Sequence, residues 1–216
     1  MRETSRKPQA TSRKPGVRSL ELEAWGSRRP VVVVSKCLLG ERCRYNGETI
    51  SAPVVLSLSD RVEFVPVCPE MGIGLLVPRD PIRLVKTRRG VRLIQARTGR
   101  DLTTRMRRFC REFLSGLPVR GFILKSRSPS CAVWDAVVDD DGGKLTGETR
   151  PGVFAAEVLA CFPGLPVEDE ERLEEPSAGR RFVGLLSASG RGLQSSLPPK
   201  AKLDSQSRRS TILLRE

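Results

Sequence analysis

The sequence of 216 residues contains no histidine. This absence excludes several classes of mechanism, because neither a Ser-His-Asp triad nor a Cys-His pair can form without an imidazole. It also excludes zinc sites with histidine ligands and haem held by histidine. Any metal that this protein binds must therefore be held mainly by cysteine or carboxylate side chains.

The sequence also lacks any apolar run long enough to span a membrane. Its basic N-terminal segment has no apolar core of the kind found in signal peptides. We therefore expect no membrane partner and a reduced, cytoplasmic setting. In such a setting the six cysteines favour metal binding or catalysis over a framework of disulfide bonds.

The formal net charge of +13 comes mainly from the two ends of the chain. Residues 1–30 contain eight basic and three acidic side chains, and residues 176–216 contain eight and two. Both ends are rich in Ser, Pro, Gly and Arg without periodicity, so we predict disordered basic tails at 1–29 and 176–216 that are dispensable for chemistry. A solvated role for the tails is favoured over nucleic-acid binding, because no RNA-binding signature accompanies their charge.

Three short apolar segments are each followed by a loop that carries a cysteine. They are 31–34 before Cys37, 62–67 before Cys68, and 119–124 before Cys131. Strands that are apolar on both faces are typical of a parallel sheet covered by helices. Because functional groups in such sheets gather beyond the carboxyl ends of the strands, we expect the three thiols to meet at one edge.

The rest of the pattern predicts a single α/β domain over residues 30–175, with a mainly parallel sheet in a three-layer-like arrangement. The other expected elements are a short helix at 53–58, a hairpin of 82–86 with 91–95, helices at 101–116 and 152–162, a looser segment at 133–138, a turn at 139–143 and a last short strand at 165–167.

Three converging thiolates at Cys37, Cys68 and Cys131 favour a soft metal or an iron–sulfur cluster. Their spacing is neither that of a ferredoxin nor that of a paired Cys-x-x-Cys zinc site, so the pattern does not identify the metal. Cys110 and Cys161 lie on the apolar faces of predicted helices, where a small buried hydrophobic role is expected.

The role of Cys43 stays open at this point. Four thiolates would complete a closed structural zinc site or a saturated cluster, whereas three would leave a metal position free for a substrate. Glu70 lies two residues after Cys68, and Ser128 lies three residues before Cys131. In a shared cleft Glu70 could act as a general base, and the Ser128 hydroxyl could hold a water or a leaving group. Alternatively, Glu70 caps a loop or is a solvated carboxylate, and Ser128 belongs to an ordinary Ser-Pro turn.

Four blocks of the sequence resemble the thiouracil desulfurase family, which was formerly catalogued as a domain of unknown function. The blocks are 35–40 (SKCLLG), 43–47 (CRYNG), 66–70 (PVCPE), and Lys125 with 128–131 (SPSC). They occur in the order of the family and at similar separations. The resemblance covers about residues 31–172.

This resemblance implies a 4Fe–4S cluster held by Cys37, Cys68 and Cys131, with the fourth iron free to bind the sulfur of the substrate. It also implies catalytic roles for Glu70 and Ser128. Two positions depart from the family pattern. Ala132 stands where the family usually has glycine, and a Gly-Gly pair is replaced by Ile73-Gly74. We expect both changes to touch the wall of the cleft.

The sequence therefore predicts an enzyme that removes sulfur from a thiolated pyrimidine such as 2-thiouracil, or a related small thioamide. The expected reaction is hydrolytic and redox-neutral, and it releases sulfide. The alternative is a module without catalytic activity that binds zinc or a cluster through cysteines and is tethered to nucleic acid by its basic tails.

Overall fold

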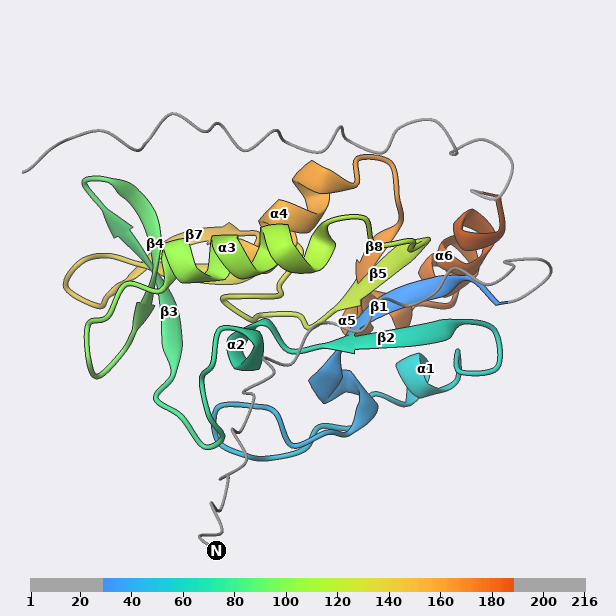
Figure 1. Ribbon diagram of the computed structural model, residues 1–216, viewed down its shortest axis with the longest axis horizontal. Helices are drawn as coiled ribbons and strands as arrows, with labels where there is room; N and C mark the ends of the chain where they lie inside the picture. The colour runs from blue at the N-terminus through green and yellow to red at the C-terminus, as the bar shows by residue number, and fades with distance from the viewer. Residues whose placement is uncertain (1–28, 189–216) are drawn as a thin grey trace, which may run out of the picture.

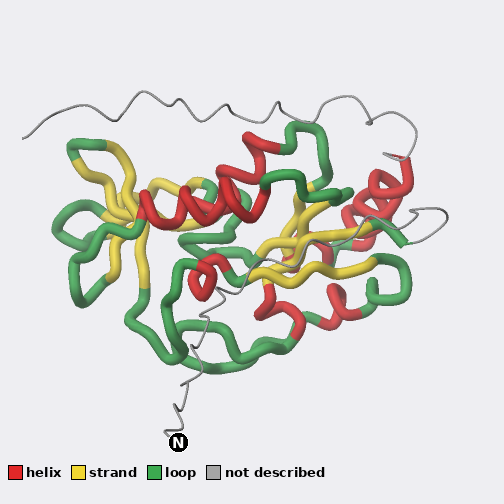
Figure 2. Tube along the Cα trace, viewed as in Figure 1, coloured by secondary structure: helices red, strands yellow, loops and turns green. Residues whose placement is uncertain are grey.

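The computed structural model describes residues 29–188 of the chain (Figure 1). Over this range the protein is a mixed α/β domain, as the sequence predicted, and its strands form two four-stranded sheets. Figure 2 shows the two sheets as separate groups of strands. The predicted tails span 1–29 and 176–216, and of these the segments 1–28 and 189–216 lie outside the described residues. Between residues 29 and 188 there is no helix with the length and apolar character needed to cross a membrane.

The first sheet contains four parallel strands in the order β2-β1-β5-β8. They are β1 (Val31–Ser35), β2 (Glu63–Val67), β5 (Gly121–Leu124) and β8 (Val167–Asp169). Every residue of β1 and β5 is buried, as expected for central strands covered on both faces. The register pairs Ser35 with Val67 and Val34 with Ile123, so β1, β2 and β5 end at the same edge of the sheet.

Helices cover both faces of this sheet and give the predicted three layers (Figure 1). The covering helices are α1 (Pro53–Leu56), α3 (Thr103–Leu114), α4 (Val153–Cys161), α5 (Glu170–Leu173) and α6 (Pro176–Ala188). Val31 and Val33 belong to an apolar core shared with α3 and α4. Val32 and Val34 belong to a second core shared with α1, α5 and α6. The four consecutive valines thus serve two cores, because successive side chains of a strand point to opposite faces.

The second sheet is mixed and has the order β4-β3-β6-β7. Its strands are β3 (Ile82–Thr87), β4 (Gly90–Gln95), β6 (Ala136–Asp139) and β7 (Leu145–Arg150). The hairpin of β3 and β4 matches the prediction, and the expected turn after residue 138 connects β6 to β7. The sequence did not predict β7 or a separate sheet, because most of β7 is polar and exposed and has no apolar alternation.

The structure differs from the predicted tail over residues 176–188, which form helix α6. Ala178, Phe182 and Leu186 recur at intervals of four residues and are buried, and Phe182 and Leu186 belong to the second core. At Gly121 a Cβ would lie 2.7 Å from Leu186 Cδ2, so the glycine at the start of β5 allows α6 to pack closely. The sequence analysis did not recognise this helical periodicity, because arginines and small residues separate the three apolar positions. The domain therefore extends past the predicted boundary at 175.

We expect the substitution Phe182→Ala to lower the free energy of unfolding by about 3–5 kcal/mol, because it leaves a cavity in the second core. Urea unfolding followed by circular dichroism measures this loss. Arg180→Ala is the matched control, since Arg180 is exposed on the same helix. Equal stability of the two variants would show that α6 does not contribute to the core.

Candidate active site

The carboxyl ends of β1, β2 and β5 open into one cavity of about 500 Å³. Cys37 lies in the short helix η1 (Lys36–Leu39), which begins directly after β1. Cys68 follows β2 and precedes the short helix α2 (Pro69–Gly72), and Cys131 lies in the loop after β5. All three thiols line the cavity. The structure thus brings together the three cysteines that the sequence analysis placed at one edge.

Cys43 is the fourth cysteine at this cavity. Its thiol forms hydrogen bonds with the thiols of Cys37 and Cys68, and the bond with Cys37 is the main reason that its pKa rises to about 11. The hydrogen bond with Cys43, together with burial, raises the pKa of Cys68. These thiols would give up their protons on binding a metal. Cys43 is therefore close enough to two predicted ligands to act as a ligand itself or to support them.

The donor set suits an iron–sulfur cluster. Among residues 29–188, no three His, Cys, Asp or Glu side chains are arranged to hold one metal ion. Soft thiol ligands distributed around a cavity are what an iron–sulfur cluster requires, because the cluster spans the space between its ligands. The residues present fit such a cluster.

Ser128 lies beside Cys131 and organises the loop around it. Its Oγ accepts hydrogen bonds from the backbone N–H groups of Cys131, at 3.1 Å, and Ser130, at 3.3 Å. Burial raises the pKa of the Cys131 thiol, although hydrogen bonds with the side chains of Ser35 and Ser128 act in the opposite direction. Ser128 therefore closes a turn and also lines the cavity. Both interpretations of this serine are compatible with its position.

Glu70 lies in the first turn of α2 and lines the same cavity. Its Oε2 accepts a hydrogen bond from Nε of Arg79 at 2.8 Å, and Nη2 of the same guanidinium lies 2.8 Å away as an ion pair. Its Oε1 accepts one from the hydroxyl of the buried Ser130 at 3.2 Å. The carboxylate is thus fixed from two sides, and it is neither a solvated group nor a loop cap.

Arg79 is a site residue that the sequence analysis missed. Its side chain is only 5% exposed, and Nη2 also donates to the carbonyl oxygen of Cys43 at 2.8 Å. Its backbone N–H donates to the carbonyl oxygen of Tyr45. One arginine therefore connects Glu70 to the loop that carries Cys43. Nothing in the sequence distinguishes it, because it is one of 38 basic residues and lies in an irregular passage.

The two departures from the family pattern lie elsewhere than expected. Ile73 and Ala132 are buried in the core next to α3 and α4, and neither they nor Gly74 line the cavity. The expectation that both changes touch the cleft wall is therefore wrong. Ala132 instead ties the Cys131 loop to the start of α4, because its carbonyl oxygen accepts a hydrogen bond from the N–H of Gly152 at 2.9 Å.

The remaining cysteines are remote from the cavity. Cys110 is buried in α3, as predicted. The same prediction is wrong for Cys161, which is exposed at the end of α4. The last turn of α4 extends past the core, since Leu159 and Ala160 are exposed as well.

Fold and cavity together define an α/β protein with a thiol-rich site for a soft metal or an iron–sulfur cluster. The chain belongs to the 2-thiouracil desulfurase family, whose model matches residues 32–170. This confirms the resemblance that the four sequence blocks indicated.

Two similar proteins support the assignment. The uncharacterized protein YbbK of Bacillus subtilis (strain 168) is 30% identical over 156 residues, which are 67% of this chain and 99% of YbbK. A solved structure described as the 4Fe–4S-dependent thiouracil desulfidase TudS is 28% identical with a TM-score of 0.52. That match covers 71% of this chain and 99% of the TudS chain. The cofactor named for TudS is the kind of cluster that the sequence analysis anticipated.

We expect Arg79→Met to lower the free energy of unfolding by about 3 kcal/mol, because it leaves the carboxylate of Glu70 buried without its partner. Adding Glu70→Gln should recover part of this loss, and a double-mutant cycle in urea measures the coupling. The control is Lys86→Met, which breaks the exposed pair with Glu148 and should cost less than about 1 kcal/mol. Additive effects at positions 70 and 79 would contradict the coupling.

Proposed function

We propose that this protein is an iron–sulfur-dependent desulfurase that removes sulfur from a thiolated pyrimidine such as 2-thiouracil. The observation that carries the proposal is the gathering of Cys37, Cys68, Cys131 and Glu70 around one cavity, in a chain of the 2-thiouracil desulfurase family. The activity and cofactor named for TudS support it. A reduced setting such as the cytoplasm suits the proposal, since all six cysteines are free.

Cys37, Cys68 and Cys131 are the residues that would hold a 4Fe–4S cluster. They follow three neighbouring parallel strands, so the sheet itself fixes the spacing of their backbones. When bound, the cluster would supply an open iron that acts as a Lewis acid toward the sulfur of the substrate. We assign Cys43 to the support of Cys37 and Cys68 through its hydrogen bonds with their thiols.

Glu70 is the residue that we assign to proton transfer. Its Oε1 carries one hydrogen bond, from Ser130, and a carboxylate oxygen can accept two. This oxygen can therefore take the proton of a water that attacks the ring carbon. Arg79 occupies Oε2 and holds the carboxylate in one orientation.

The proposed reaction is hydrolytic and redox-neutral. Water replaces sulfur at a carbon whose oxidation level does not change, and the products are the oxo base and sulfide. No electron donor is required by this stoichiometry. The Ser128 hydroxyl lines the cavity and can hold a water or the departing sulfur.

The alternative is a module that binds zinc or a cluster without catalysis. Analysis of the protein after anaerobic purification distinguishes it from the proposed enzyme. The proposal predicts a brown protein that contains iron and sulfide and releases sulfide from 2-thiouracil. A colourless protein with one zinc per chain and no turnover would overturn it.

We expect each of Cys37→Ser, Cys68→Ser and Cys131→Ser to abolish the binding of iron, because a cluster held by three thiolates loses a third of its protein ligands. Cys110→Ser and Cys161→Ser should retain iron and serve as controls. Iron content per folded chain is the measurement, and full iron in any of the first three variants would refute the ligand set. Cys43→Ser should retain the cluster, so its loss from a folded Cys43 variant would make Cys43 a ligand.

We expect Glu70→Gln to retain a brown, folded protein and to lose about 10²-fold or more in turnover, the usual scale for a general base. Ser128→Ala should lose less, because a water can replace a hydroxyl. The assay is anaerobic release of sulfide from 2-thiouracil without added reductant. Wild-type turnover by the Glu70 variant, or a stoichiometric need for reductant, would exclude this mechanism.

A further inference from the structure

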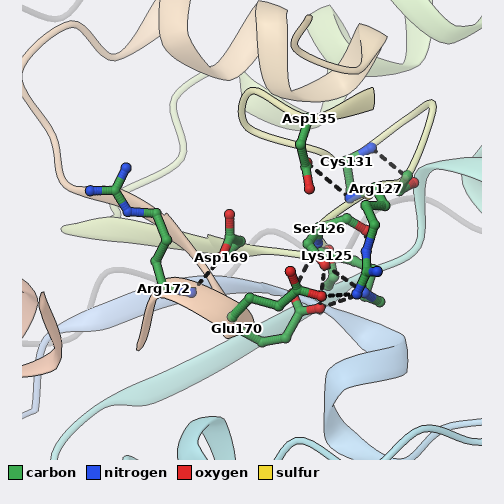
Figure 3. Close-up of polar contacts among 11 residues, drawn as sticks. Lys125, Ser126, Arg127, Cys131, Asp135, Asp169, Glu170 and Arg172 are labelled. Atoms are coloured by element: carbon green, nitrogen blue, oxygen red, sulfur yellow. Dashed lines mark hydrogen bonds and ion pairs between the residues drawn. The ribbon is translucent and has the colours of Figure 1, made fainter. Parts of the chain in front are cut away.

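A buried carboxylate lies directly behind the loop that carries Cys131. Figure 3 shows Glu170, the first residue of α5, next to Lys125 and Ser126. Glu170 is 8% exposed and does not line the cavity. Its Oε2 accepts the backbone N–H of Ser126 at 2.9 Å, and its Oε1 accepts the Ser126 hydroxyl at 2.6 Å. The ammonium group of Lys125 also donates to Oε1. The carboxylate of Glu170, the ammonium of Lys125 and the N–H and hydroxyl of Ser126 thus meet at a largely buried point.

Lys125 has no hydrogen-bond donor left for a substrate. An ammonium group has three N–H donors. Those of Lys125 are directed to Glu170, to the Ser126 hydroxyl at 2.8 Å and to the Ser126 carbonyl oxygen at 3.2 Å. Although Lys125 lines the cavity, its hydrogen bonds hold the loop in place.

The same contacts continue to the predicted ligand. The backbone N–H of Lys125 donates to Ser35 Oγ at 3.0 Å, and the Ser35 side chain forms a hydrogen bond with the thiol of Cys131. Further along the loop, the N–H of Arg127 donates to Asp135 at 2.9 Å, at a residue whose φ of 53° marks a sharp change of direction. The loop is therefore fixed at its base by Glu170 and at its turn by Asp135.

We propose that Glu170 is a positioning residue which, through Lys125 and Ser126, holds the 125–131 loop so that Cys131 and Ser128 face the cavity. This inference rests on the proposed function for the role of Cys131 as a ligand. Burial acts to raise the pKa of Glu170, but the hydrogen bonds from Lys125 and Ser126 outweigh it, so that the pKa lies below its ordinary value. Glu170 is thus a carboxylate at neutral pH, as the pairing with Lys125 requires.

Glu170→Gln is the direct test, performed on the full chain. Glutamine keeps the size of the side chain, but it leaves the Lys125 ammonium without a countercharge and turns one acceptor into a donor that faces the donors of Ser126. The matched control is Glu174→Gln, an exposed glutamate four residues further along the chain.

Two measurements separate positioning from a role in stability alone. In the iron-loaded protein, transfer of iron to a chelator should be about 10–100-fold faster in Glu170→Gln than in the control, the usual cost of losing a group that orients a ligand. In the metal-free protein, alkylation of Cys131, followed by peptide mass spectrometry, should be faster by about tenfold relative to Cys110. Circular dichroism must show both variants folded at the temperature used.

Lys125→Met and Lys125→Arg complete the test. Lys125→Met should accelerate both reactions as Glu170→Gln does, and Lys125→Arg should restore part of the wild-type behaviour because it keeps a cation beside Glu170. The inference is overturned if folded Glu170→Gln or folded Lys125→Met loses iron and is alkylated at Cys131 at the same rates as Glu174→Gln. If only one of the two variants folds, that variant decides. The alkylation assay needs no cluster, so a wild-type protein without iron would refute the proposed function while Cys131 reactivity still decides the role of Glu170.

Discussion

The parallel pairing of β1 with β2 and β5 is the constraint on which the rest of this structure depends. Parallel strands that are in register end at one edge, so the segments that follow them must start side by side. The consecutive valines of β1 make this strand apolar on both faces and bury it between two cores. The positions of Cys37, Cys68 and Cys131 follow from this geometry.

Buried ion pairs hold the polar loops that the sheet brings together. Arg79 binds Glu70 and the carbonyl oxygen of Cys43, and so connects the loops that follow β1 and β2. Lys125 and Glu170 perform the corresponding task for the loop after β5. Loops rich in serine and proline have few apolar side chains with which to pack, and charge-assisted hydrogen bonds supply directional contacts in their place.

The sequence predicted the parts of the fold that depend on one continuous pattern. The valine run of β1 and the cysteines after apolar segments needed no information from elsewhere in the chain. Arg79 and Glu170 were missed because their importance comes from partners 9 and 45 residues away. Helix α6 was missed because its apolar stripe, which includes Phe182, is diluted by arginine and glycine. Ala132 was expected in the wall of the cleft because it follows Cys131 in the sequence. Adjacent residues can point in different directions, and Ala132 points into the core.

The saturation of the Lys125 ammonium affects how the cavity can select a guest. Because all three of its donors are occupied, this cation acts on the contents of the cavity through its electric field and makes no direct contact of its own. A field extends over several ångströms and carries no directional requirement. The carboxylate of Glu170 lies against this ammonium and offsets most of that field. Lys125 therefore neither orients a bound molecule nor gives the cavity a strong preference for negative charge, and selection of the substrate is left to the other residues that line the cavity.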